Sequence, residues 1–353
     1  MSLLRDPGVA AALAAAALFG AGTPLAKVLL DAVSPWLLAG VLYLGSGIGL
    51  AIWRWSRGRP TVRLARNDVA WLAGAVFFGG MVGPVLLMWG LAHTGAATAS
   101  LLLNAEGVLT ALLAWFVFHE NFDCRIALGM ACIVAGAVVL TWQPGGSPEG
   151  DPGSLWPSIA IIGACFAWAV DNNLTRNVSL ADATFVAMVK GLTAGITNVA
   201  IAFASGAAVP TALAMLSGGV LGLLSYGVSL VLFVIALRHL GTARTGAYFS
   251  MAPFVGAVIA VTFLGEPIRV SLGIAALLMG VGVWLHLTER HLHEHRHEAM
   301  EHEHEHEHEH DAHHQHAHDE PIEPGVRHRH LHRHELLTHS HEHYPDAHHR
   351  HRH

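Results

Sequence analysis

Long apolar runs separated by short polar segments dominate the first 290 residues of the chain. A helix needs about 20 apolar residues to cross the ~30 Å hydrocarbon core of a bilayer, and these runs have that length. Backbone groups in lipid must be hydrogen-bonded within the protein, and the runs are far too long for barrel strands, so they predict membrane-spanning helices. The predicted spans are residues 8–30, 35–53, 69–90, 95–118, 125–142, 155–176, 181–204, 216–237, 243–264 and 270–288.

One apolar stretch occurs twice in the chain. Residues 91–120 read LAHTGAATASLLLNAEGVLTALLAWFVFHE, and residues 237–266 read LRHLGTARTGAYFSMAPFVGAVIAVTFLGE, so that Glu120 aligns with Glu266 without a gap. Each half then holds five spans, and because five is odd the second half must enter the membrane from the opposite side. Such inverted repeats are common in secondary transporters. We therefore predict an all-α polytopic membrane protein with ten transmembrane helices in two inverted five-helix repeats.

The same pattern divides the chain into four parts. The first five-helix repeat is expected at residues 1–142 and the second at 155–290, joined by a linker rich in Pro and Gly at 143–154. Residues 291–353 form a polar tail of low complexity. This tail has too few apolar residues to form a core, so we expect it to be disordered.

Arg residues set the expected orientation. The loop RWSRGRPTVRLARND after the second span holds five Arg, whereas QPGGSPEGDPGS and SGAAVPTA on the other side hold none. Cytoplasmic loops carry the excess of positive charge, so both termini are expected in the cytoplasm and the linker in the periplasm. The protein is expected to be a multi-pass component of a bacterial-type inner (plasma) membrane, with the first apolar run retained as a span and not cleaved as a signal peptide.

The chain resembles the EamA-type members of the drug/metabolite transporter superfamily. The resemblance covers roughly residues 8–288 and rests on FGAGTPLAK in the first span, LLLNAEGVLTALLAWFVFHE in the fourth and AYFSMAPFVGAVIAVTFLGE in the ninth. Pro253 and Glu266 match the family pattern, whereas Gly107, preceded by Glu106, stands where the fourth span should carry Pro. The resemblance implies ten helices, cytoplasmic termini and transport of small solutes, without indicating which solute.

Ionisable residues inside the spans are the candidate functional residues, because burying a charge in lipid costs several kcal/mol. Charged residues make up only 13% of the chain. We expect Glu106 and Asp171 to line a central cavity, where a carboxylate could exchange a proton for substrate. The alternative for Glu106 is a structural ion pair or a neutral, hydrogen-bonded side chain. The expected cavity and coupling residues are Lys27, Asn104, Glu106, Asp171, Asn172, Asn173, Arg176 and Lys190.

We expect the counter-charge to come from Lys190, which lies near the middle of its span, or from Lys27 or Arg176. The last two lie near span ends, where long basic side chains can also reach the headgroups. Pro24, Gly107 and Pro253 are expected to interrupt helices at depth and to serve gating, with ordinary kinks as the alternative.

Histidine dominates the tail, which holds 24 of the 28 His of the chain. Imidazole is a leading ligand for Zn, Ni, Co and Cu, so the composition indicates metal binding without one defined site. A pH-responsive tail is the alternative, because imidazoles titrate near pH 6.5. The expected tail ligands are His302, His304, His306, His308, His310, His313 and His314.

Three functions fit these patterns. The first is a secondary active exporter of a small metabolite or xenobiotic that works by alternating access. The second is efflux of a divalent metal with the tail as collector or sensor, and the third is a non-transporting membrane metal buffer. No nucleophile–base pair or cofactor motif appears, so we do not expect an enzyme, and we expect neither a required cofactor nor a nucleic-acid partner. The expected partners are the bilayer and a small-molecule or metal-ion substrate, with monomer and homodimer both open.

Overall fold

The computed structural model describes the chain in several ranges. In the helical part these are residues 7–58, 66–118, 124–141, 155–176 and 182–287. In the tail they are residues 292–297, 300–306, 328–334 and 337–342. The expected linker at 143–154 lies outside the described residues, as do tail residues 308, 310, 313 and 314.

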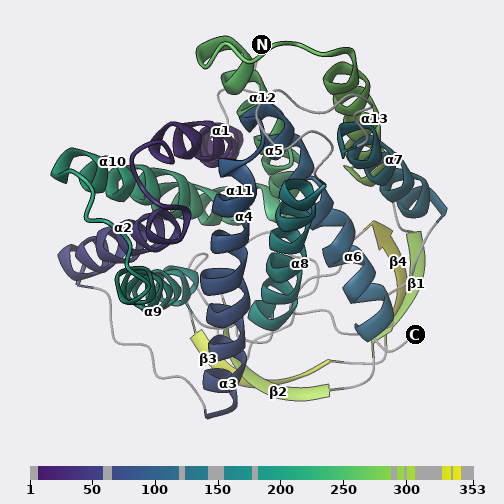
Figure 1. Cartoon of the computed structure of the whole chain (residues 1–353). Coiled ribbons are helices and arrows are strands. Elements are labelled where there is room, and N and C mark those ends of the chain that lie inside the picture. Colours follow the sequence, from purple (N-terminus) through teal and green to yellow (C-terminus); the bar gives the residue numbers. More distant parts are fainter. Residues whose placement is uncertain are drawn as a thin grey trace. The chain divides into compact units, whose positions relative to one another are not determined.

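All regular secondary structure in the described part of both repeats is helical (Figure 1). The first half holds α1 (Pro7–Leu29), α2 (Pro35–Ser56), α3 (Arg66–Ala75), the π-helical segment η2 (Val76–Val82), α4 (Gly83–Ala92), α5 (Ala96–Leu102), α6 (Ala105–Phe118) and α7 (Cys124–Thr141). The second half holds α8 (Trp156–Arg176), α9 (Ala183–Ala204), α10 (Ala212–Gly222), η3 (Leu223–Val228), α11 (Ser229–Phe249), α12 (Ala252–Phe263) and α13 (Val270–Leu287).

Six helical segments of the described chain are long and apolar enough to cross a bilayer: Pro7–Leu29, Pro35–Ser56, Asp68–Ala92, Ala96–Leu113, Thr184–Ala204 and Ala212–Ala236. Three shorter apolar helices follow at Arg125–Thr141, Ala252–Phe263 and Val270–Leu285. The remaining predicted span is α8, whose last turns carry Asp171, Asn172 and Asn173. Length and composition thus support six to nine spans directly, and the all-helical architecture of the body is confirmed.

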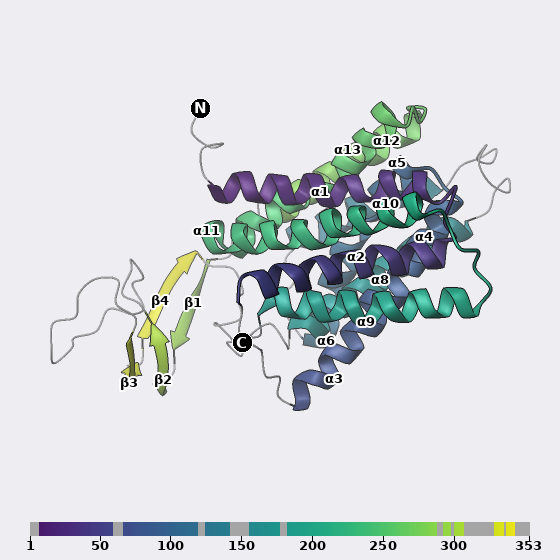
Figure 2. The same ribbon diagram turned by 90° about the vertical axis from the view of Figure 1, so that its left-hand side faces the viewer.

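Helix packing reproduces the repeat as a pseudo-two-fold relation. Between the halves, α2 packs on α9 and α7 on α13, and the two helices of each of these pairs are equivalent by the repeat; the fourth and ninth spans, which are also equivalent, meet through α5 and α12. The contact of α1 with α11 is matched by that of α4 with α8, and the contact of α1 with α12 by that of α6 with α8. Figure 2 shows α2 beside α9 and α1 beside the α10–α11 segment. The two halves therefore pack against each other through several helices of each.

Irregular backbone occurs at matching places in the two halves. At the offset of 146 residues, η2 falls on residues 222–228, which η3 occupies almost completely. The fourth span breaks at Leu103, between α5 and α6, and its counterpart breaks at Ser250, between α11 and α12. The two halves therefore repeat each other in backbone conformation as well as in amino-acid sequence.

The predicted reversal between the eighth and ninth spans lies inside α11. The rings of Phe233 and Phe249 have centroids 4.9 Å apart. Sixteen residues of straight α-helix would separate them by about 24 Å, so the chain must turn back between them. Tyr248 also packs beside Leu232 against Ala236. The two predicted spans are therefore present, although the turn between them is helical rather than a loop.

The tail differs from the expectation of disorder. Its described residues form β1 (Leu292–His297), β2 (Met300–His306), β3 (His328–His334) and β4 (Leu337–Glu342). Strand β1 pairs with β4 and β2 with β3, both antiparallel, in two two-stranded sheets. Although the tail has few apolar residues, its His residues alternate with Glu or Arg in the two-residue period of a strand.

Candidate functional site: a polar cluster between the halves

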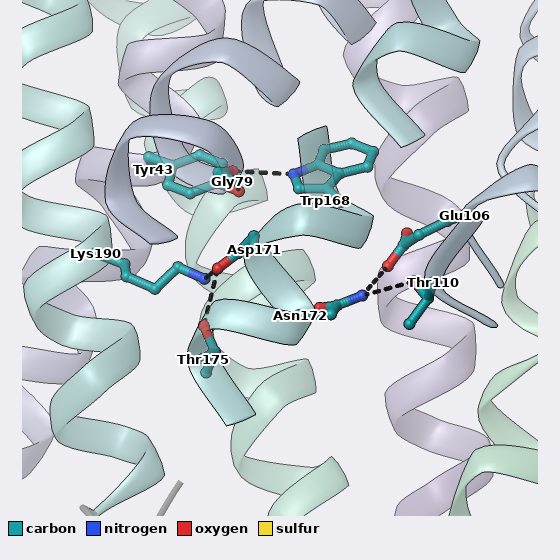
Figure 3. Close-up of polar contacts among 9 residues, drawn as sticks. All are labelled: Tyr43, Gly79, Glu106, Thr110, Trp168, Asp171, Asn172, Thr175 and Lys190. Carbon is teal, nitrogen blue, oxygen red and sulfur yellow. Dashed lines mark hydrogen bonds and ion pairs between the residues drawn. The ribbon is translucent and has the colours of Figure 1, made fainter. Parts of the chain in front are cut away.

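Asp171 and Lys190 form an ion pair inside the helical body (Figure 3). The Lys190 Nζ atom lies 2.6 Å from Asp171 Oδ1 and also contacts Oδ2. The Thr175 hydroxyl, one helical turn later on α8, donates to Asp171 Oδ1 at 2.9 Å. Asp171 is buried, with 5% of its surface exposed. Because both members of the pair are charged and in contact, this part of the cluster has no net charge.

The Glu106 carboxylate accepts a hydrogen bond from a neutral side chain in the other half of the molecule. The Asn172 amide on α8 donates to Glu106 Oε1 on α6 at 2.9 Å, and it lies 3.5 Å from the Thr110 hydroxyl. Asn172 follows Asp171 directly and points the other way, since neighbouring residues are about 100° apart around a helix (Figure 3). Among the side chains that the structure describes, Asn172 and not a cation is the polar partner of Glu106.

The Glu106 side of the cluster is open. Asn172 and Gly107 are both exposed, and a Cβ placed on Gly107 would meet nothing within 4 Å. Open space therefore adjoins α6 at Gly107 and α8 at Asn172, while Glu106 is half-buried and Asp171 is buried.

Two aromatic side chains from different halves hold the π-helical segment η2 against α8. The Tyr43 hydroxyl and the Trp168 indole N–H both donate to the carbonyl oxygen of Gly79, at 2.7 and 2.9 Å. In a π-helix this carbonyl would accept from residue 84, five positions on, but Pro84 has no N–H. The freed carbonyl therefore takes side-chain donors, as π segments at functional sites commonly permit.

Gly79 also sets the distance between η2 and the ion pair. A Cβ at this position would overlap the Asp171 carboxylate, so only glycine lets η2 approach α8 so closely. The neighbouring carbonyl of Gly80 accepts from the buried Asn198 amide at 3.1 Å. Neither Tyr43 nor Trp168 was among the residues expected at the site. Their signal was an aromatic ring with a polar atom inside a span.

Lys27 lies away from the cluster. Its ammonium donates to the carbonyl oxygens of Leu91 and Thr94 at 2.9 Å each, and to that of Ala92 at 3.3 Å. Leu91 and Ala92 are the last two residues of α4, where a positive charge compensates the helix dipole, and Thr94 follows in the loop. Of the three expected counter-charges, the structure brings Lys190 alone to a carboxylate among the described side chains, since the side chain of Arg176 lies outside them.

The two other expected amides are likewise held locally. Asn104 is buried and donates to the Leu101 carbonyl at 2.9 Å, where it sits in the break between α5 and α6. Asn173 is buried and donates to the Ala169 carbonyl at 2.8 Å.

The expected helix breaks are displaced. Pro24 lies inside the continuous helix α1, and Gly107 and Pro253 lie in the first turns of α6 and α12. The interruptions come three to four residues before Gly107 and Pro253, at Leu103 and Ser250.

A second ion pair joins the C-terminal end of α2 to the N-terminal end of α9. Arg54 donates to Asp182 and, at 2.7 Å, to the Thr184 hydroxyl. Asp182 caps α9 by accepting from the Thr184 N–H at 2.9 Å. Partial burial alone would raise the pKa of Asp182, but the hydrogen bonds from Thr184 and Arg54 outweigh it and lower that pKa to about 2.

Comparison with known proteins decides what this arrangement belongs to. A sequence profile described as the EamA-like transporter family matches residues 6–142 and 155–288, which together are most of the chain. The chain belongs to the EamA-like transporter family. This EamA-like protein is therefore a multi-pass membrane transporter and not an enzyme.

Relatives of this EamA-like protein carry similar names. An uncharacterized transporter of Methanothermobacter thermautotrophicus is 29% identical over 287 residues, which are 76% of this chain and 82% of the relative. A Streptantibioticus cattleyicolor protein, named a probable terminal-alkyne amino-acid exporter, is 29% identical over 201 residues, which are 55% of this chain and 67% of the relative. A solved crystal structure with 20% identity covers 78% of this chain and 95% of its own, with a TM-score of 0.59, and shows the fold alone.

Among the side chains that the structure describes, no group of three or more His, Cys, Asp or Glu is placed to hold a metal ion.

Proposed function

We propose that this protein is a secondary active exporter of a small amine-bearing metabolite, and that it exchanges this solute for protons by alternating access between its two halves. One observation carries the proposal. Glu106 of the first half meets Asn172 of the second half beside an ion pair that is already neutral. An ionisable residue inside a span is a functional-site candidate by default, and among the described side chains the polar partner of Glu106 is a neutral amide.

Charge balance explains why the solute should carry an amine. Asp171 and Lys190 cancel each other, so an ionised Glu106 leaves the cluster with one negative charge. A charge in this environment needs compensation, which either a proton or the ammonium group of a solute can supply. Because one carboxylate cannot hold both at once, proton and solute exclude each other there, and this exclusion couples their movements.

The placement of the two partners links occupancy to conformation. Glu106 and Thr110 lie on α6, and Asn172 lies on α8 of the opposite repeat. A rocking of one half against the other changes the Glu106–Asn172 contact, and binding of an ammonium group at Glu106 replaces that contact. Rocking of repeats about a site between them is the general mode of inverted-repeat transporters.

The name of one relative supports a solute that carries an amino group. The Streptantibioticus cattleyicolor protein is named as an exporter of an amino acid, and an amino acid carries an ammonium group at neutral pH. On this basis we propose export as the direction of transport and an amine-bearing solute for the present protein.

We further propose that both termini face the cytoplasm of a bacterial-type inner membrane. The support is the Arg-rich loop after α2, whose counterparts on the other side carry no Arg or Lys at residues 143–154 and 205–211. In this orientation the Arg54–Asp182 contact lies at the cytoplasmic end, and Lys27 lies at the outer end.

Counterflow in proteoliposomes tests the proposed function. Purified protein is reconstituted and offered labelled amino acids and the matching α-hydroxy acids, in which a hydroxyl replaces the ammonium group. We expect amino acids alone to move, at a rate that depends on the imposed pH gradient. Glu106→Gln should lower that rate about tenfold or more, whereas Asp31→Asn, which removes an exposed carboxylate outside the cluster, should not. Equal transport of hydroxy acids, or unchanged gradient dependence in Glu106→Gln, would overturn the proposal.

A further inference from the structure

Strand register in the tail aligns histidines across from one another. In the β2–β3 pair, His302 lies opposite His332, His304 opposite His330, and His306 opposite His328. In the β1–β4 pair, His293 lies opposite His341 and His295 opposite His339. Five cross-strand positions therefore hold a histidine on both strands.

Alternation places these histidines on one face of each ribbon. Successive residues of a strand belong to opposite faces, so all six paired histidines of β2–β3 share a face. The other face of this ribbon has Glu301 opposite Arg333 and Glu305 opposite Arg329. Opposite charges at facing positions favour this register over a slip by one residue, which would set histidine against Glu or Arg.

The spacing of one face suits a transition-metal ion. Facing residues of an antiparallel pair have Cβ atoms about 4.5–5.5 Å apart, and neighbours on the same face along a strand are about 7 Å apart. Two successive His–His pairs thus provide four histidine positions about 5 Å apart across the ribbon and about 7 Å apart along it. Zn²⁺ takes four ligands with Zn–N distances of about 2.0–2.1 Å, and imidazole also suits Ni²⁺ and Cu²⁺.

We propose that the β2–β3 ribbon is a binding site for late first-row divalent metal ions, formed by successive His–His pairs of its histidine face, and that β1–β4 provides a second site of the same kind. The tail, residues 291–353, holds six Arg and fourteen Asp and Glu residues, so its net charge favours a dication. This proposal concerns the tail alone and stands independently of the transported solute.

Metal binding should also strengthen the ribbons. An isolated two-stranded ribbon is marginally stable in water, and these have no apolar face with which to pack. An ion that ties the strands together adds its binding free energy to their pairing. A ribbon site therefore loses its affinity when either strand loses its histidines, whereas a flexible chelator loses affinity only in proportion to the number removed.

Zinc titration of the full-length protein in detergent tests this difference. Metal-free protein is titrated with ZnCl₂ against a chromophoric chelator that reports only tight sites, with MgCl₂ as the control metal. In the face variant, His302, His304 and His306 become Gln. In the matched variant Glu301, Glu303 and Glu305 on the same strand become Gln. A chain ending at Arg290 shows what the helical body binds.

We expect the face variant to lose all tight Zn²⁺ binding of the β2–β3 ribbon although β3 keeps its four histidines, and the Glu variant to keep the number of tight sites. The chain ending at Arg290 should bind no Zn²⁺ tightly. The proposal is overturned if the face variant loses only about one eighth of the binding, the share of three among 24 histidines. Equal loss in the Glu variant, or tight sites retained without the tail, would overturn it as well.

Discussion

Charged side chains in this protein bind either an opposite charge or the free backbone groups at the end of a helix. Lys27 covers the last carbonyls of α4, while Glu266 accepts from the backbone N–H groups of Ala96 and Ala97 at the start of α5. Positive charge thus stands at a helix C-terminus and negative charge at the next N-terminus, as the helix dipoles favour. Against this background Glu106 stands out, since its described partner is neutral.

The Asp171–Lys190 pair yields the first residue-scale prediction. Lys190→Met leaves the buried Asp171 carboxylate without its cation and should cost about 3–5 kcal/mol of unfolding free energy. Asp171→Asn combined with Lys190→Met removes both charges and should recover most of that loss. Titration with sodium dodecyl sulfate, read by circular dichroism, measures the three stabilities. A double variant less stable than Lys190→Met would contradict the pairing.

Asp182 yields a prediction about pH. Its pKa is about 2 in the folded protein, against 3.8 for an ordinary Asp. A lowered folded pKa contributes stability above pH 3.8, and this contribution is lost as pH falls through about 2. Asp182→Asn, which removes the charge, should therefore cost about 1 kcal/mol at pH 6, after allowance for solvent screening, and almost nothing at pH 2. Unfolding of both proteins in a maltoside detergent measures the difference, and a cost that does not change with pH would contradict the assignment.

At the scale of elements, close packing depends on residues without side chains and on backbone that departs from the α-helix. Helices α2 and α9 approach until a Cβ on Gly191 would stand 2.7 Å from the Cα of Gly47. In lipid such small-residue contacts are a main source of helix association. Pro84 frees the Gly79 carbonyl in η2, and the side chains of Tyr43 and Trp168 use it to join three helical segments.

A pair of glycine substitutions tests the packing. Gly47→Ala inserts a methyl group into the α2–α9 contact and should cost about 1–3 kcal/mol, because one of the helices must shift. Gly273→Ala on α13 adds the same methyl where nothing lies within 4 Å. It should be neutral or should stabilise by up to about 1 kcal/mol through helix propensity. Detergent unfolding compares the two, and equal effects would count against tight packing at Gly47.

At the scale of the whole molecule, the repeat could be predicted from the sequence, whereas the side-chain contacts between its two halves could not. The doubled stretch and odd number of spans indicate ten helices in inverted halves, and the packing of equivalent helices agrees with this. The Asn172–Glu106 hydrogen bond joins helices of different halves, so no local spacing reveals it. The π segment η2 depends on which donors reach the carbonyl groups near Pro84, which the sequence alone does not show. The tail strands depend on pairing between segments that are far apart in the chain.

If proton and solute share the Glu106 carboxylate, binding of the solute must release a proton. Purified protein in weakly buffered detergent solution is mixed with the transported amino acid, and the pH change is recorded with a dye. At a pH where Glu106 is protonated, the wild type should release close to one proton per bound solute, and Glu106→Gln none. Binding without proton release in the wild type, or equal release in Glu106→Gln, would contradict the account.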